Sequence, residues 1–184
     1  MTTPPTVVFL DRDGTIIHDV AYLSRAEQVE LLPGAADAIR RLNAAHIPVV
    51  VATNQSGIAR GLLTVEDYRR GERHIAALLA AQGAHLEGTY FCPHLPTVTG
   101  PCDCRKPAIG MFVRAARDLS LDMRRPAFVG DRWRDVAAVE SLGGTAILIS
   151  SPATPPEDIV RAHDEGVAVM PSLASAVDSL LPPP

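Results

Sequence analysis

Val7-Val8-Phe9-Leu10-Asp11-Arg12-Asp13-Gly14-Thr15 is the stretch that decides how this sequence folds. Its first four residues are apolar and mostly β-branched or aromatic, which predicts a short buried strand. Two carboxylates, Asp11 and Asp13, follow one residue apart, and such like charges repel each other and lose hydration when they are buried. A strand that ends in an acidic turn would also produce this pattern, so the rest of the sequence has to decide between a turn and a site.

The place of the two acids favours a catalytic site. In open α/β sheets, ligands bind outside the carboxyl ends of the strands, which is where both side chains would lie. There one carboxylate can attack a phosphorus atom while a second one manages the proton of the leaving group. Asp11 is thus the candidate nucleophile, and Asp13 is the candidate general acid and base.

The composition predicts one α/β domain over residues 1–184. Hydrophobic residues make up 47% of the chain but aromatic ones only 4%, so the core should consist mainly of Ala, Val, Leu and Ile. The net charge of −4 argues against a general nucleic-acid binder. No apolar run approaches the roughly 18 to 20 residues that span a membrane, and the first residues lack the features of a secretory signal. We expect a soluble, cytoplasmic monomer.

Apolar runs and helical periodicities alternate along the chain, which predicts a parallel sheet with helices on both faces. After the first strand, further strands are expected at about 47–52, 89–91, 126–129, 145–149 and 167–170. Helices are expected at about 34–45, 64–82, 108–119, up to 142, before 167 and at 172–181. Residues 16–32 should form an irregular loop with a small hairpin. Its residues His18, Asp19 and Tyr22 are either substrate contacts or ordinary surface residues.

Polar and charged side chains follow two other apolar runs. Thr53 and Asn54 come after the second strand, where hydroxyl and amide groups can bind a phosphate. Asp131 ends the strand at 126–129, as Asp11 ends the first, and it can complete a Mg²⁺ site. Asp135 comes one helical turn later, and it is either an orienting partner of Asp131 or a surface acid.

Arg105 and Lys106 form a pair of cations directly before Pro107. Proline suits the first turn of a helix, which places the pair directly before the N-terminus of the helix at 108–119. A helix N-terminus favours anions through its dipole and its free N–H groups. The pair therefore predicts an anion site.

The three cysteines of the chain gather in one region with a histidine. Cys92, His94, Cys102 and Cys104 provide three sulfurs and one imidazole across a short loop, which is a ligand set for tetrahedral zinc. Four protein ligands leave no open position for a catalytic water. We therefore predict a structural zinc loop at about 92–104.

The ordered series Asp-x-Asp-Gly-Thr, Thr-Asn, Arg-Lys-Pro and Gly-Asp-x₃-Asp resembles the haloacid dehalogenase (HAD) superfamily over nearly the whole chain. The resemblance implies a single Rossmann-like domain without an inserted cap domain. It also implies a phosphatase that forms an aspartyl-phosphate on Asp11, with Asp13 transferring protons.

The same resemblance implies a role for each remaining motif residue. Mg²⁺ would be held by Asp11, Asp131 and the backbone carbonyl of Asp13. The transferred phosphoryl group would contact Thr53, Asn54 and Lys106, and a second phosphate on the substrate would contact Arg105.

Within the superfamily, the zinc loop resembles two groups of phosphatases. One group removes the 7-phosphate of a heptose 1,7-bisphosphate, and the run Ser-Gly-Ile-Ala-Arg-Gly at 56–61 favours it. The other group is the histidinol-phosphatases, which His94-Leu95-Pro96 and the seven residues between His94 and Cys102 favour. A non-catalytic binding protein and a phosphotransferase are two further hypotheses.

Overall fold

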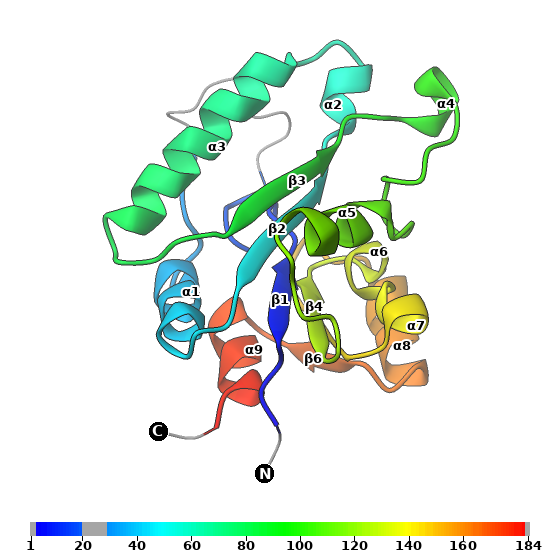
Figure 1. The fold of residues 1–184 in the computed structure, drawn as a ribbon. Helices are drawn as coiled ribbons and strands as arrows, with labels where there is room; N and C mark the ends of the chain where they lie inside the picture. The colour runs from blue at the N-terminus through cyan, green and yellow to red at the C-terminus, as the bar shows by residue number, and fades with distance from the viewer. Residues whose placement is uncertain (1–2, 20–28, 183–184) are drawn as a thin grey trace.

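A parallel sheet forms the centre of the computed structural model, which describes residues 3–19 and 29–182. In this part of the chain, six strands lie in the order β3-β2-β1-β4-β5-β6 (Figure 1). The strands are β1 Val7–Leu10, β2 Val49–Asn54, β3 Gly88–Cys92, β4 Pro126–Gly130, β5 Thr145–Ile149 and β6 Ala168–Met170. The single parallel α/β sheet predicted from the sequence is confirmed.

Helices connect the strands and cover both faces of the sheet. Among the described residues they are α1 Ala35–Ala44, α2 Ser56–Ala59, α3 Val65–Ala80, α4 Pro96–Thr99, α5 Gly110–Asp118, α6 Trp133–Val136, α7 Val139–Leu142, α8 Pro156–Asp164 and α9 Leu173–Leu180. Helices α1, α3 and α9 pack on one face, and α5 to α8 pack on the other (Figure 1). None of these helices combines the length and the apolar character that crossing a bilayer requires.

Strand β1 is buried on both faces because helices cover each side of the sheet. Leu10 packs in the layer of α1 and α9, whereas Phe9 packs in the layer of α5 and α6. The Phe9 ring lies 5.2 Å from the ring of Phe112 on α5 and 5.6 Å from that of Phe128 on β4. These aromatic contacts hold in place the strand that directly precedes Asp11.

The order of the strands reverses beside β1. The chain adds β2 and β3 on one side of β1 and then returns to place β4 on the other side. Open α/β sheets bind ligands at such a switch point, outside the carboxyl ends of the strands. Asp11 and Asp131 follow the ends of β1 and β4, so the topology brings together two acids that are far apart in sequence.

Three differences from the predicted bounds concern the site residues or the helices beside them. Strand β2 extends to Asn54, so Thr53 and Asn54 lie on the strand and not after it. The helix predicted up to residue 142 consists of two short helices, α6 and α7. Helix α5 begins at Gly110, so Pro107 lies before the helix, after a cis peptide bond. The helix therefore begins about two residues later than predicted, and Pro107 lies outside its first turn.

The segment after β1 returns close to its own start. Ile17 and Leu31 form an isolated antiparallel bridge, which joins the two ends of the loop. His18 and Asp19 are exposed, and Tyr22 lies outside the described residues. The described ends of this loop thus lie beside the carboxyl end of β1.

Candidate active site

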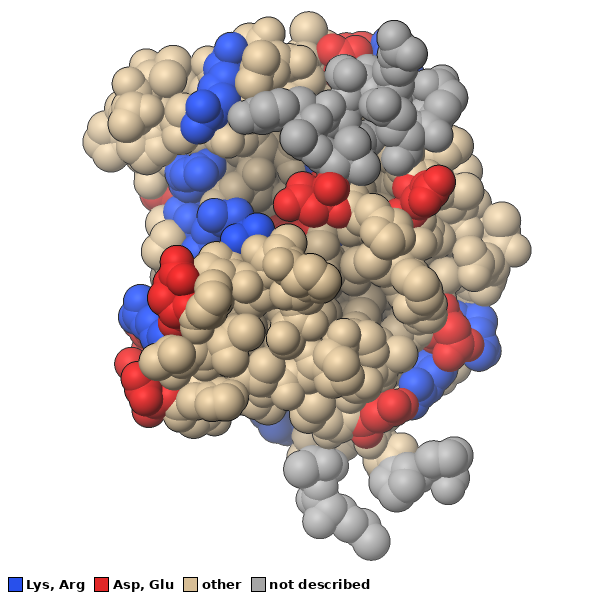
Figure 2. All heavy atoms as spheres, turned by 180° about the vertical axis from the view of Figure 1, so that it is seen from behind, with Lys and Arg blue, Asp and Glu red and all other residues tan. Residues whose placement is uncertain are grey.

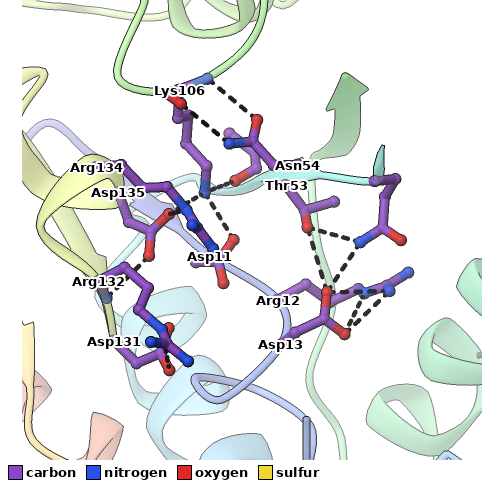
Figure 3. Close-up of polar contacts among 12 residues, drawn as sticks. Asp11, Arg12, Asp13, Thr53, Asn54, Lys106, Asp131, Arg132, Arg134 and Asp135 are labelled. Carbon is purple, nitrogen blue, oxygen red and sulfur yellow. Dashed lines mark hydrogen bonds and ion pairs between the residues drawn. The ribbon is translucent and has the colours of Figure 1, made fainter. Parts of the chain in front are cut away.

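Lys106 joins the acids at the centre of the site. Its ammonium lies 2.6 Å from Asp11 Oδ1 and 2.8 Å from Asp135 Oδ1, and it also donates to the carbonyl of Ala52 (Figure 3). The residue is only 2% exposed. A buried ammonium needs compensating charges and hydrogen bonds, and these three contacts supply them. They hold a positive charge directly beside the carboxylate of Asp11.

Asn54 fixes the backbone of Lys106. The side-chain amide of Asn54 donates to the Lys106 carbonyl at 3.1 Å, and its oxygen accepts from the Lys106 N–H at 3.1 Å. These reciprocal bonds connect the end of β2 to the loop before α5. The polar atoms of the Asn54 side chain thus bind the backbone of Lys106. The predicted contact of Asn54 with the phosphate stays a prediction. Thr53, beside it, is buried and its hydroxyl accepts from Gln55 at 2.9 Å.

Asp131 lies over Gly14, and only glycine fits there. A Cβ on residue 14 would come within 2.5 Å of Asp131 Oδ2, and the φ of +78° is one that L side chains rarely adopt. Asp131 Oδ2 is buried and accepts no hydrogen bond from any described residue. Arg132 pairs with it loosely, with Nε 3.4 Å away. This oxygen therefore has capacity for a ligand.

Three carboxylates meet at this edge of the sheet, and together they fit a divalent cation. Asp11, Asp131 and Asp135 each place an oxygen within 4.8 Å of the others. Burial, with the charges of Asp11 and Asp135, raises the pKa of Asp131 to about 7. Burial and the charge of Asp11 raise the pKa of Asp135 to about 6, against the effect of Lys106. Hard oxygen donors and uncompensated negative charge are what Mg²⁺ requires.

The surroundings of Lys106 favour its protonated, positively charged form. Burial alone would lower the pKa of its ammonium, but the charges of Asp11 and Asp135 outweigh burial and raise the pKa. The side chain therefore stays protonated at neutral pH. It can stabilise negative charge beside Asp11 but cannot act as a base.

Asp13 points away from Asp11 toward a separate group of donors (Figure 3). Arg12 Nη2 donates to both carboxylate oxygens, at 3.0 and 3.1 Å, and the side-chain amide of Gln55 donates to Oδ2 at 2.9 Å. Burial raises the pKa of Asp13, while the charge of Arg12 opposes that shift. A raised pKa brings a carboxyl group closer to the range in which it can deliver a proton at neutral pH.

The predicted zinc ligands come together at the end of β3. One ligand atom from each of Cys92, His94, Cys102 and Cys104 lies within 4.8 Å of the others, and the three cysteines are free thiols. The Cys92 and Cys102 sulfurs are 3.7 Å apart. Tetrahedral zinc with bonds of about 2.3 Å separates two sulfurs by about 3.7 Å. This separation and the four donors suit a tetrahedral metal ion, around which the Cys92 and Cys104 sulfurs, 3.0 Å apart, would have to move slightly farther apart.

A pocket of about 270 Å³ opens between these groups and is lined by Asp11, Asp13, Asp131 and Asp135. Arg132 and Arg134, from the turn between β4 and α6, also line it, with side chains that are 24% and 50% exposed. Figure 2 shows Lys and Arg side chains gathered beside a hollow on one face of the molecule. The pocket thus combines acids that suit a metal ion with cations that suit an anionic ligand.

Arg105 lies at the edge of the cysteine loop. Its Nη1 donates to the carbonyl of His94 at 3.1 Å, which ties the arginine to the metal-binding loop. The described residues that line the pocket do not include Arg105. Its contact with a second phosphate therefore stays a prediction.

Several residues of the site were missed or left open in the sequence analysis. Asp135 is 4% exposed, so the surface interpretation of this acid is wrong, and its second oxygen accepts from the Arg132 N–H at 3.0 Å. Its position four residues after Asp131 was the available signal. For Gln55 and Glu72, which contact Asp13 and Arg12, the sequence contains no comparable signal.

The fold and this site together define a hydrolase of the HAD type, and a family model described as HAD-hydrolase-like matches residues 103–176. D-glycero-beta-D-manno-heptose-1,7-bisphosphate 7-phosphatase from Yersinia pestis is 38% identical over 155 residues, which cover 81% of this chain and 82% of that protein. The enzyme of that name from Escherichia coli K12 is 40% identical over 156 residues, covering 80% and 82%. The chain therefore belongs to the heptose bisphosphate phosphatase family of HAD-like hydrolases.

A solved structure supports the same placement. The D,D-heptose 1,7-bisphosphate phosphatase from B. bronchiseptica, complexed with magnesium and phosphate, is 33% identical to this chain. It superposes with a TM-score of 0.85 over 95% of this chain and 97% of the other. The family predicted from the motifs is confirmed.

Proposed function

We propose that this phosphatase hydrolyses the 7-phosphate of D-glycero-D-manno-heptose 1,7-bisphosphate, with Asp11 as the nucleophile. The observation that carries the proposal is the contact of 2.6 Å between Lys106 and Asp11, one of the acids that line the pocket. The names of the relatives support the heptose substrate, as does the run Ser-Gly-Ile-Ala-Arg-Gly at 56–61.

In the first step, a carboxylate oxygen of Asp11 attacks phosphorus, and the bond between phosphorus and the sugar oxygen breaks. Asp13 gives its proton to the leaving alkoxide, which departs as the sugar hydroxyl. Lys106 stabilises the negative charge that gathers on the transferring group, because its ammonium is already oriented beside Asp11. Thr53 and Asn54, at the end of β2, are proposed to contact the same group.

In the second step, water attacks the phosphorus of the aspartyl-phosphate. Asp13, now ionised, takes a proton from that water, and the bond between phosphorus and Asp11 breaks. Inorganic phosphate leaves and both carboxyl groups return to their starting states. One residue thus serves as acid and then as base.

Mg²⁺ fits the acid cluster, where Asp11 and Asp131 would hold it together with the backbone carbonyl of Asp13. The unpartnered buried oxygen of Asp131 supports this assignment. Asp135 has both of its oxygens bound to the protein, which suits a residue that orients Lys106. When bound, the ion would supply positive charge to neutralise the transferring phosphoryl group.

Zinc is proposed as a structural ion in the cluster of Cys92, His94, Cys102 and Cys104. Four protein ligands leave no position for a reacting water. The bond from Arg105 to the His94 carbonyl suggests that the ion shapes the loop that carries Arg105 and Lys106. Three cysteines without a disulfide suit a reducing compartment, so we propose that the enzyme is cytoplasmic. We also propose that it works as a monomer.

Comparative kinetics test the proposal. Wild-type protein with Mg²⁺ should release inorganic phosphate from the heptose bisphosphate faster than from histidinol phosphate, and the product should be the 1-phosphate. Asp11→Asn should have no turnover, because an amide is not a nucleophile here. Faster turnover of histidinol phosphate, or transfer of phosphate to a sugar instead of water, would overturn the assignment.

A further inference from the structure

Arg12 is buried between two carboxylates that come from different parts of the chain. Its Nη2 lies 3.0 Å from Asp13, and its Nη1 lies 2.8 Å from Glu72 on α3. The side chain of Arg12 is 3% exposed and that of Glu72 is 11% exposed. Burial of a guanidinium is stable only with such partners, so the position of Arg12 depends on Glu72.

Helix α3 holds the guanidinium on a second side as well. Tyr68, one turn before Glu72, places its ring under Arg12, with the guanidinium carbon 5.3 Å from the ring centroid. The Tyr68 ring in turn packs on Phe91 of β3, with centroids 4.2 Å apart. A planar cation that stacks on a ring and is hydrogen-bonded at its edges has little freedom to move.

This arrangement fixes the carboxyl group of Asp13. One oxygen accepts from Nε and Nη2 of Arg12, at 3.3 and 3.0 Å. The other accepts from Nη2 at 3.1 Å and from Gln55 at 2.9 Å (Figure 3). A proton donor contributes to the rate only when it is held in the right place, and a shift of 1 Å can cost about 100-fold.

We propose that Glu72 is a positioning residue for the reaction, acting through Arg12 to hold Asp13 where it protonates the leaving alkoxide. This inference rests on the proposed function, because it assumes the role of Asp13. Glu72 itself touches neither the substrate nor the reacting atoms. Its contribution should therefore appear only where the leaving group needs a proton.

The leaving group provides the test. An alkyl phosphate expels an alkoxide that must be protonated, whereas p-nitrophenyl phosphate expels a stable phenolate that needs little help. The quantity to measure is kcat/KM with Mg²⁺ present, because it covers the steps up to departure of the leaving group. Glu72→Gln should lower kcat/KM for the heptose bisphosphate by about 10- to 100-fold and leave that for p-nitrophenyl phosphate within about twofold.

Three further variants make the result specific. Glu66→Gln, on the same helix, alters an exposed ion pair with Arg73 and should change neither substrate. Asp13→Asn should show the same difference between substrates as Glu72→Gln. If Glu72→Gln does not fold, Glu72→Asp, which keeps the charge on a shorter side chain, should show the difference to a smaller degree.

The outcomes separate the inference from the proposed function. If Asp13→Asn distinguishes the two substrates but the Glu72 variants lower both equally or neither, Glu72 is not a positioning residue. If Asp13→Asn itself does not distinguish them, the role of Asp13 is wrong and the inference fails with it.

Discussion

Lys106 and Asp135 form an ion pair behind Asp11, with Nζ and Oδ1 2.8 Å apart and side chains that are 1% and 2% exposed. The same ammonium contacts Asp11 at 2.6 Å, so one cation pairs with an acid that follows β1 and an acid on α6. Because Asp135 also accepts the N–H of Arg132, the turn after β4 is coupled to the end of β1. We expect the stability and the chemistry of the site to depend on this one side chain.

Lys106→Met should destabilise the fold as well as abolish turnover. The substitution leaves the acids without their buried cation, and breaking a buried ion pair typically costs about 3 to 5 kcal/mol. Urea unfolding at neutral pH measures the loss. Arg40→Met is the control, because Arg40 and Asp37 form an exposed pair that should contribute at most about 1 kcal/mol. Equal losses in the two variants would contradict the account.

Asp131→Asn should stabilise the metal-free protein. The pKa of Asp131 is raised to about 7, against about 3.9 in an unfolded chain. Between these values the folded state binds a proton that the unfolded state has released, so this group makes stability fall as pH rises. The difference in unfolding free energy between variant and wild type should therefore grow from about pH 4 to about pH 7.

Magnesium provides the complementary measurement on the same two proteins. It should raise the Tm of the wild type at about pH 8 more than at about pH 5, because protons compete for the Asp131 carboxylate at low pH. It should have little effect on Asp131→Asn. A wild-type response to Mg²⁺ that is independent of pH would mean that this acid is not a ligand.

The two metal sites should separate under chelation. Mild chelation should stop catalysis reversibly by removing Mg²⁺, while about one zinc ion per chain remains in the cluster of four protein ligands. Cys102→Ser should lose zinc and stability, whereas Asp131→Asn, the control, should keep zinc. Elemental analysis that finds no zinc in protein grown with zinc would refute the structural role.

Substrate choice should depend on Arg105, which is bound to the metal-binding loop. Arg105→Ala should lower kcat/KM for the bisphosphate by roughly 10- to 100-fold, the scale of a charge-assisted contact, and leave a simple monophosphate nearly unchanged. The same two kcat/KM values are compared for Arg134→Ala, because Arg134 lines the pocket whereas Arg105 is hydrogen-bonded to the metal-binding loop. Equal losses on both substrates for Arg105→Ala would assign it to the loop structure.

Much of this site could be predicted because its motifs follow apolar strands. The run Val7–Leu10 predicts a buried strand, and the carboxyl-edge rule then places Asp11 and Asp131 together. The spacing of Cys92, His94, Cys102 and Cys104 predicts a cluster without any knowledge of the fold. In each case the residue type and a local pattern were sufficient.

The supporting contacts could not be predicted, because they join segments that are far apart in sequence. Arg12 and Glu72 are 60 residues apart, and Asn54 binds the backbone of a residue 52 positions later. Asp135 is buried because it pairs with Lys106, whose ammonium also contacts Asp11 and the carbonyl of Ala52 on β2. Such pairings depend on the tertiary fold, which local periodicity does not encode.

The central claim is that Asp11 carries the phosphoryl group taken from position 7 of the sugar. Rapid acid quenching during turnover of heptose bisphosphate labelled with radioactive phosphorus only at position 7 tests it most directly. We predict transient label on the peptide that contains Asp11, no such label in Asp11→Asn, and release of the label as inorganic phosphate. Phosphate release without label on Asp11, or label that stays in the sugar monophosphate, would contradict the account.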